Sequence, residues 1–244
     1  KPTSTPVDPN IKLGSVEEDV VVDKEMYQRL VGKLIYLSHT RLDITFAMSL
    51  LSQFMHQPKE AHLRVALRIV VEFVGGPMCW NTRLFSATAG GGAFCNGQRI
   101  QVSATNQVER SLLVTGFGYD HDDAWATNID LFKEFTDVSR GVRRLGAAAV
   151  DMCHVALGIV EAYWEYRLKP WDMAAGVLMV EEAGGTVSRM DGGKFCVFDR
   201  SVLVSNGLLH VKLLERIGPA TEKLKSNGID FSLWYKPENY RADV

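Results

Sequence analysis

The feature that most constrains the fold is an alternation of short apolar strands and small-residue helices between residues 142 and 185. Residues 142–150 (VRRLGAAAV) predict a short strand that passes through a glycine into an Ala-rich helix. The alternating residues 159–166 predict a second strand. Residues 173–182 predict an apolar helix that Gly184 and Gly185 end in the left-handed conformation. This order is typical of an α/β fold.

One carboxylate stands at the start of the last of these helices. In the segment Pro170–Gly176 (PWDMAAG), Asp172 falls at or near the predicted N-cap. The free N–H groups and the positive end of the helix dipole favour an anion there, so this position suits a carboxylate, a divalent cation and a phosphate. Asp is also a preferred N-cap residue without any ligand, and taken alone the motif favours that plain role.

A second carboxylate and a small-residue turn change that balance. Glu165 lies seven residues before Asp172, and strand alternation puts it on the same face as Glu161 and Tyr163. The turn at Gly146 lets a ligand approach the backbone closely. Two carboxylates and an open turn in this order favour a ligand site over a capping residue alone.

These motifs resemble the C-terminal half of the inositol monophosphatase family. The segments Trp171–Gly176 and Glu181–Gly185 resemble the family's C-terminal signature, and Gly90–Gly97 resembles its Gly-rich hairpin. From Val71 to Val244 the chain is similar to the plant plastid-type members. The resemblance implies an α/β (α+β) fold, namely the C-terminal half of the family's layered α/β sandwich, preceded by about three helices of foreign origin.

The resemblance also implies a chemistry, which is Mg²⁺-dependent hydrolysis of inositol monophosphate or a related small phosphomonoester. Asp172 is then expected to contact the metal and the inositol, and Glu165 to hold substrate hydroxyl groups. Gly146, Ala147 and Ala148 are expected to line the ring pocket through their backbone. Arg143 either supports that turn or lies on the surface. The family further implies a homodimer and a chloroplast location, although we find no transit peptide in the chain.

The rest of the family's metal site comes from an upstream Glu-Glu run followed by an Asp-Pro-Ile-Asp-Gly-Thr loop, and we find neither. Asp8–Ile11 begins like the loop but has Ile where the second Asp must bind, and Glu17–Glu18 follows it instead of preceding it. The acidic segment Asp120–Asp123 matches a loop leading into a helix. Because Mg²⁺ demands near-octahedral oxygen ligation, we expect an incomplete site. The sequence thus predicts a truncated family member whose activity is lost or strongly impaired.

The first seventy residues have a different character. Tyr27–Leu37 and Ser52–Pro58 resemble the segment after the polymerase core of copia-type retrotransposon polyproteins, with Leu42 standing where that pattern usually has Pro. We therefore predict a chimera of three parts: a disordered linker over 1–22, a helical retroelement-like segment over 23–70, and the phosphatase-like half over 71–244.

Composition excludes several function classes. The net charge of −2 over 244 residues gives no basic footprint for nucleic acid. No apolar run reaches the roughly 18 residues that suggest a membrane span. The four cysteines show neither CxxC nor Cys/His metal spacing, which favours reduced thiols. We expect neither nucleic acid nor membrane as a partner.

Other segments have plainer patterns. Strands are predicted over 80–89, 100–103 and 112–116, and helices over 122–138 and 208–225. Glu165 and Asp172 are expected to lie close together beside the Gly146 turn, in a cleft open toward the first seventy residues. Three functions remain open: a non-catalytic remnant, which we favour, an active phosphomonoesterase with compensating ligands, and a non-catalytic retroelement-derived binding protein.

Overall fold

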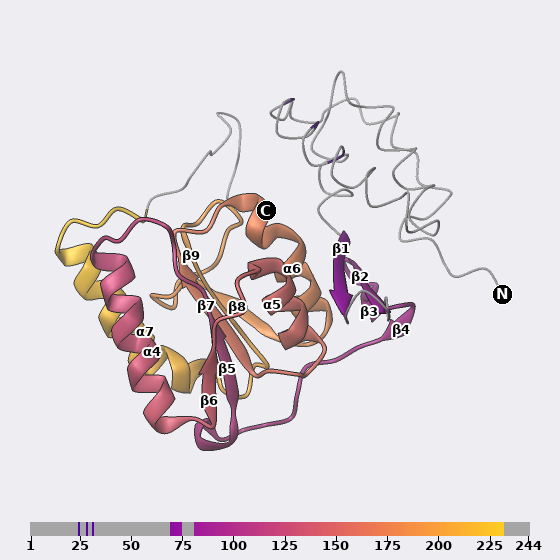
Figure 1. Ribbon diagram of the computed structural model, residues 1–244, viewed down its shortest axis with the longest axis horizontal. Coiled ribbons are helices and arrows are strands. Elements are labelled where there is room, and N and C mark those ends of the chain that lie inside the picture. The colour runs from indigo at the N-terminus through magenta and orange to yellow at the C-terminus, as the bar shows by residue number, and fades with distance from the viewer. Residues whose placement is uncertain (1–23, 25–27, 29–30, 32–68, 75–80, 232–244) are drawn as a thin grey trace. The chain divides into compact units, whose positions relative to one another are not determined.

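The computed structural model describes Lys24, Gln28, Val31, residues 69–74 and residues 81–231 (Figure 1). The chain divides into two compact units, one of Val70–Lys236 and one of Lys1–Ile69 with Pro237–Val244. Lys24, Gln28 and Val31 are helical. Apart from these three positions, the predictions for residues 1–68 lie outside the described residues.

A five-stranded sheet forms the centre of the larger unit, with the strand order β6-β5-β7-β9-β8. The strands are β5 (Leu112–Thr115), β6 (Gly141–Arg143), β7 (Ala162–Tyr166), β8 (Thr186–Ser188) and β9 (Ser201–Ser205). Strands β6, β5 and β7 run parallel, whereas β9 is antiparallel to both β7 and β8. In this register Thr115 pairs with Trp164, so β5 and β7 end at the same edge of the sheet.

A second sheet has four strands in the order β1-β2-β3-β4. Its strands are β1 (Ile69–Val74), β2 (Asn81–Thr88), β3 (Gly92–Cys95) and β4 (Gln98–Arg99). The predicted strand over 100–103 is wrong. The tight turn at Asn96 and Gly97, with φ of 50° and 78°, leaves a short β4. The Val102 N–H then donates to the Ala183 carbonyl, at 3.1 Å, instead of joining the sheet.

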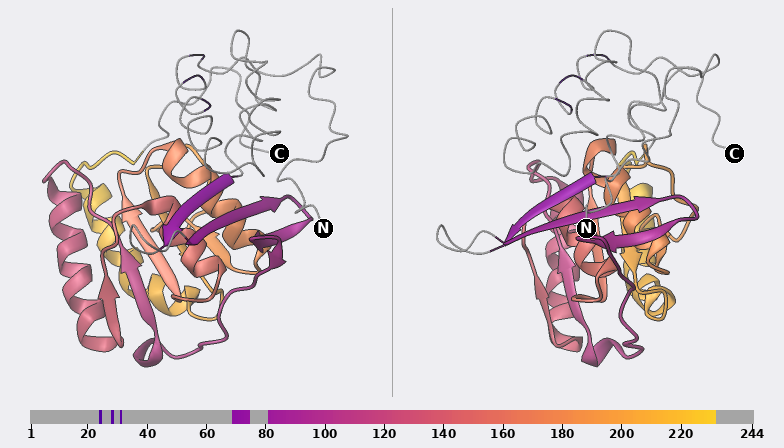
Figure 2. Two further views of the ribbon diagram at one scale, coloured as in Figure 1. Left: turned by 45° about the vertical axis from the view of Figure 1, so that its right-hand side comes forward. Right: turned by 90° about the vertical axis from the view of Figure 1, so that its right-hand side faces the viewer.

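Four helices lie in two pairs on the two faces of the five-stranded sheet. Helices α4 (Asp123–Val138) and α7 (His210–Ser226) cover one face, and α5 (Ala148–Ala156) and α6 (Pro170–Glu182) cover the other (Figures 1 and 2). The pair α5 and α6 lies between the two sheets, so its small residues pack on both sides. A short 3₁₀ turn over Val108–Arg110 precedes β5. These layers confirm the predicted α/β sandwich architecture.

Helix α6 begins three residues earlier than the sequence pattern predicts. Pro170 occupies its first position, where a proline loses no intrahelical hydrogen bond. Asp172 is therefore the third helical residue and not the N-cap, which is Lys169. None of the described helices is both long and apolar enough to cross a membrane.

Candidate functional site

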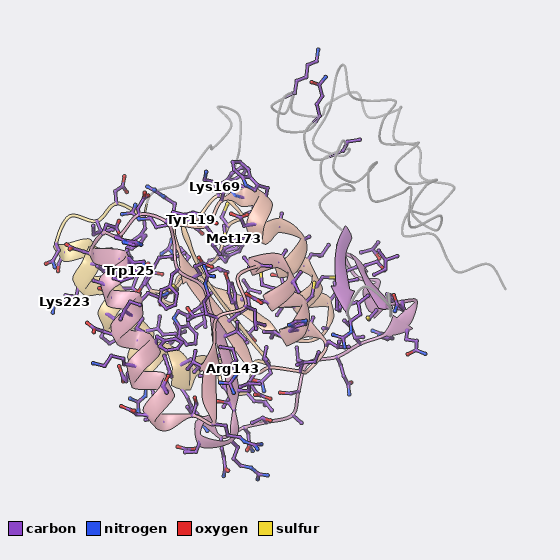
Figure 3. The ribbon with its side chains drawn as sticks, in the orientation of Figure 1. Tyr119, Trp125, Arg143, Lys169, Met173 and Lys223 are labelled. Carbon is purple, nitrogen blue, oxygen red and sulfur yellow. The ribbon has the colours of Figure 1, made fainter. Side chains whose placement is uncertain are left out.

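The carboxyl ends of the parallel strands bring three loops together. The chain leaves β5 at Gly116, leaves β6 through the turn at Gly146, and leaves β7 through Arg167 into α6. Tyr119 and Lys169, which follow β5 and β7, both lie at the upper end of the sheet in Figure 3. Ligands of open α/β sheets bind at this edge.

Glu165 is the penultimate residue of β7, and its side chain lies against the end of β5. The Tyr163 hydroxyl donates a hydrogen bond to Glu165 Oε2. A Cβ atom placed on Gly116 would stand 1.9 Å from the same oxygen, so only a glycine leaves room for the carboxylate there. The residue is 9% exposed. The sequence prediction that Tyr163 and Glu165 share a face is confirmed.

Burial raises the pKa of Glu165 to about 7. The Tyr163 hydrogen bond and the positive charge of Arg144 oppose this shift, whereas the negative charge of Asp172 adds to it. Near neutral pH, Glu165 therefore holds its proton for part of the time.

Tyr163 is fully buried, and burial raises its pKa well above the usual value, with further contributions from Glu165, Asp151 and Asp172. Its hydroxyl group therefore remains a proton donor. Asp151, on α5, is 1% exposed and belongs to this buried acidic group. No motif indicated Asp151, although an acidic residue within the otherwise apolar helix AAVDMCHVA is an unusual feature of the sequence.

Asp172 is half-buried in the first turn of α6. Its Oδ2 accepts a hydrogen bond from the backbone N–H of Lys169, at 3.1 Å, which stabilises the helix start. Asp172 thus helps to cap the helix from its third position and not as the N-cap residue that the sequence pattern suggested. Its negative charge also acts on both Glu165 and Tyr163. The closeness of Glu165 and Asp172 expected from the sequence stays a prediction.

The predicted small-residue turn lies at the start of α5. Gly146 has a φ of 92°, a left-handed conformation that favours glycine. Ala147 is the N-cap of α5 and provides no side-chain cap for the N–H groups that follow. Arg143 is exposed and donates to the Val142 carbonyl of its own strand, at 3.1 Å, so it lies on the surface. The basic residue that acts on Glu165 is Arg144 instead.

The acidic segment 120–123 has a structural role. Asp122 accepts the Trp125 N–H at 3.1 Å as the N-cap of α4, and it forms an ion pair with Arg167. Arg167 has a φ of 67°, unusual for a residue with a side chain. This pair ties the loop after β5 to the loop between Glu165 and Asp172.

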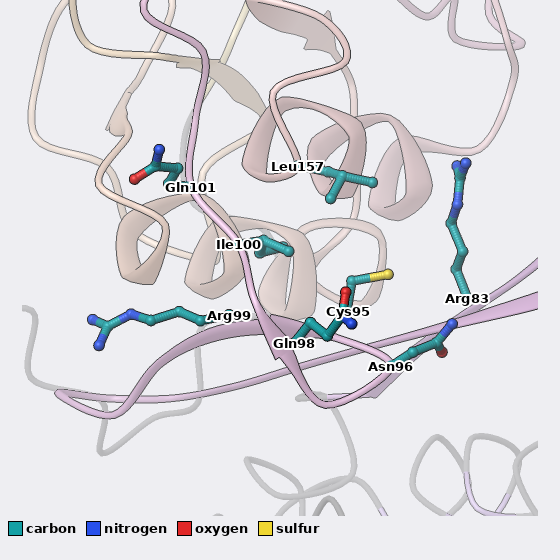
Figure 4. A pocket seen from close by; sticks show the side chains of 8 residues that line it. All are labelled: Arg83, Cys95, Asn96, Gln98, Arg99, Ile100, Gln101 and Leu157. Atoms are coloured by element: carbon teal, nitrogen blue, oxygen red, sulfur yellow. The ribbon is translucent and has the colours of Figure 1, made fainter.

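Among the residues that the structure describes, no three His, Cys, Asp or Glu side chains are grouped closely enough to bind an ion together. A cavity of about 460 Å³ lies elsewhere, between the β3–β4 hairpin and Leu157 at the end of α5 (Figure 4). In Figure 4 the side chain of Arg99 extends to the left and that of Arg83 extends upward at the right, so the two do not converge on one ligand. None of the predicted site residues lines this cavity.

Comparisons with known proteins agree with the motifs. Residues 63–226 match the model of the inositol monophosphatase family. The chain is 83% identical over 175 residues to phosphatase IMPL1, chloroplastic, of Arabidopsis thaliana, covering 72% of this chain and 47% of that protein. It is 37% identical over 149 residues to human inositol monophosphatase 1, covering 60% of this chain and 53% of that protein. It thus spans about half the length of these relatives.

Solved structures show the same fold. The inositol monophosphatase from Anabaena (Nostoc) sp. PCC 7120 aligns with a TM-score of 0.53 and 42% identity, over 55% of this chain and 54% of that one. Inositol monophosphate-bound SaIMPase-II aligns with a TM-score of 0.52 and 28% identity, over 60% of this chain and 57% of that one. The resemblance of residues 1–70 to a retrotransposon segment stays a prediction.

Proposed function

Because this chain belongs to the inositol monophosphatase family, we propose that residues 71–244 form the polyol-binding half of a Mg²⁺-dependent phosphomonoesterase site. We further propose that the polypeptide by itself hydrolyses inositol monophosphate slowly or not at all. The observation that carries the first proposal is the position of Glu165 at the end of β7 and of Asp172 in the first turn of α6, which follows that strand at the carboxyl edge of the parallel strands, with the charge of Asp172 acting on Glu165.

The groups at this edge suit a polyhydroxylated substrate. A carboxylate accepts hydrogen bonds from several directions, so Glu165 can bind neighbouring hydroxyl groups of a ring. The N–H groups at the start of α5, after Gly146 and Ala147, lack a side-chain cap and can donate to substrate oxygens. Ala148 adds no bulk at this entrance.

The carboxylate of Asp172 is the type of ligand that Mg²⁺ binds in proteins. Mg²⁺ prefers carboxylate oxygens, and Asp172 presents one at the positive end of α6. When bound, the metal would polarise the phosphoryl group and supply an activated water. Its other ligands would have to come from beyond the described residues, because no group of three potential ligands occurs among them. This is the reason for proposing low turnover of the isolated chain.

The remaining proposals follow from the relatives. The Arabidopsis relative is named a chloroplastic phosphatase, and we propose a chloroplast location for this chain too. The homodimer that the family resemblance implies stays a proposal. The net charge of −2 supports neither a nucleic-acid partner nor a polyanionic one.

The experiment that tests the function combines binding and turnover. Binding of myo-inositol 1-phosphate in millimolar Mg²⁺ is followed by calorimetry, and phosphate release is measured on the same samples. Glu165→Gln and Asp172→Asn are compared with the exposed control substitutions Glu109→Gln and Asp123→Asn. We expect both site variants to weaken binding, Asp172→Asn chiefly when Mg²⁺ is present, and both controls to bind like the original chain.

Phosphate release should not exceed the blank for any of these proteins. Turnover that Asp172→Asn abolishes would show a complete catalytic site and contradict the proposed loss of activity. Binding that neither site variant changes would refute the polyol site itself.

A further inference from the structure

We infer that Gly116 and Tyr163 are positioning residues, which hold the Glu165 carboxylate in one orientation for contact with substrate hydroxyl groups. The inference rests on the proposed polyol site and adds two residues that no motif singled out for this role. Both belong to the parallel-strand edge, one at the end of β5 and one within β7.

Gly116 sets the position of the carboxylate by lacking a side chain. A Cβ atom there would lie 1.9 Å from Oε2, 2.4 Å from Cδ and 2.8 Å from Oε1 of Glu165, all closer than real Cβ contacts. Its φ is not in the left-handed region, so the turn itself does not require glycine. The close approach of Glu165 is the feature that does.

The backbone of Gly116 is itself fixed. Asn128, on α4, donates from its side-chain amide to the Gly116 carbonyl at 2.7 Å. The same amide group accepts the indole N–H of Trp164, also at 2.7 Å, and Trp164 immediately precedes Glu165. The buried Asn128 side chain therefore fixes the distance between the Gly116 backbone, against which the Glu165 carboxylate lies, and strand β7, which carries Glu165.

Tyr163 sets the rotation of the carboxylate. Its ring is fully buried, so the hydroxyl group that donates to Glu165 Oε2 has little freedom to move. With one oxygen held by Tyr163 and the group resting on Gly116, the carboxylate loses little additional entropy when a substrate hydroxyl binds.

The test uses Gly116→Ala and Tyr163→Phe, each with a matched control. Gly118→Ala adds the same methyl group two residues later, where it meets Arg167 Cβ at an ordinary 3.5 Å. Tyr166→Phe removes a buried hydroxyl group from the same strand, one that hydrogen-bonds Thr221 at 2.8 Å. Dissociation constants are measured by calorimetry in Mg²⁺ for two probes, myo-inositol 1-phosphate and inorganic phosphate.

We expect the dissociation constant for myo-inositol 1-phosphate to rise roughly tenfold in Gly116→Ala and Tyr163→Phe, the loss expected for a hydrogen bond to a charged group. Inorganic phosphate, which has no ring hydroxyl groups, should bind each variant like the original chain, and both controls should bind both probes normally. A merely structural defect would instead weaken both probes together, and that result would overturn the inference.

A second measurement separates this inference from the proposed function. In protein labelled with ¹³C at the glutamate carboxyl carbons, the Glu165 signal is assigned from its loss in Glu165→Gln. The signal should shift in Tyr163→Phe and Gly116→Ala and remain in place in the two controls. If the original chain binds no inositol phosphate, the proposed function fails while the shifts still decide the positioning role. A Glu165 signal unchanged in Tyr163→Phe refutes that role even if Gly116→Ala does not fold.

Discussion

The side-chain oxygen of Asn128 accepts a hydrogen bond from the indole N–H of Trp164, at 2.7 Å, inside the cluster of apolar residues that joins α4 to the sheet. Both residues are buried, at 1% and 0% exposure. The amide nitrogen of Asn128 donates to Thr115 Oγ1 and to the Gly116 carbonyl. A single helical side chain therefore satisfies polar groups at the ends of two parallel strands, one of them on the residue that precedes Glu165.

Replacing Asn128 by Ala is predicted to destabilise the fold. The Trp164 N–H, the Thr115 hydroxyl and the Gly116 carbonyl would lose their shared partner in a buried setting, at a cost of about 2–4 kcal/mol. Urea denaturation of Asn128→Ala measures the change in unfolding free energy. Asp130→Ala, an exposed change on the same helix, should stay within about 0.5 kcal/mol of the original protein. Equal stabilities for the two variants would contradict the assigned role of Asn128.

Glu182 joins the end of α6 to the Gly-rich turn between β2 and β3. Its two carboxylate oxygens accept the backbone N–H groups of Gly90 and Gly92, at 2.6 and 2.7 Å. Glu182→Gln leaves only one acceptor oxygen, so we expect the Gly90 or Gly92 amide to exchange with solvent faster and stability to fall by about 1–2 kcal/mol. Hydrogen exchange followed by NMR tests this. The neighbouring exposed change Glu181→Gln should leave both amides protected.

Several features of the site could be predicted from the sequence because they depend on local patterns. Strand alternation placed Tyr163 and Glu165 on one face, and the order of strands and helices placed Glu165 and Asp172 at one edge. Gly146, between a strand and an Ala-rich helix, marked the turn correctly. These properties follow from backbone geometry over a few residues.

Other features depend on contacts between distant segments and gave no local signal. Gly116 follows a strand like many glycines, and its importance comes from a carboxylate 49 residues later in the sequence. Val102 continues a strand-like pattern but pairs with the end of α6. The position of Asp151 near Tyr163 could not be predicted, because helix periodicity indicates which residues are buried but not which charged groups of other segments lie beside them. The early start of α6 shows how a proline at the first position can extend a helix beyond its apolar run.

The raised pKa of Glu165 predicts a pH-dependent stability. Burial is the main cause, and it takes the pKa from 4.5 to about 7. Between these values the folded protein keeps a proton that the unfolded chain releases, so stability is highest below pH 4.5 and falls as pH rises toward 7. A pKa that moves from 4.5 to about 7 changes the stability by at most about 3.4 kcal/mol. Glu165→Gln, which is always neutral, should remove this fall in urea denaturation at pH 5 and pH 8. An unchanged pH dependence would contradict the assignment.

His210 is predicted to act in the opposite direction over much of the same range. Its ring nitrogens lie 2.9 Å from Ser205 Oγ and Ser188 Oγ, and burial lowers its pKa from 6.5 to about 4. Between these values the unfolded chain binds a proton that the folded protein does not, so His210 makes stability rise with pH from 4 to 6.5.

Acidification therefore removes stability through His210 while it adds stability through Glu165. His210→Gln should lower stability at neutral pH, because one hydrogen bond to the two serines is lost, and should also remove the rise of stability with pH that His210 contributes between pH 4 and 6.5. Urea denaturation at pH 7.5, 6.0 and 4.5 measures both effects, with the exposed His121→Gln as the control. In His210→Gln the influence of Glu165 is no longer opposed by His210, so between pH 4.5 and 7.5 stability should fall more with rising pH than it does in the original protein. A variant with the same pH dependence of stability as the original protein would show that another group titrates in this range.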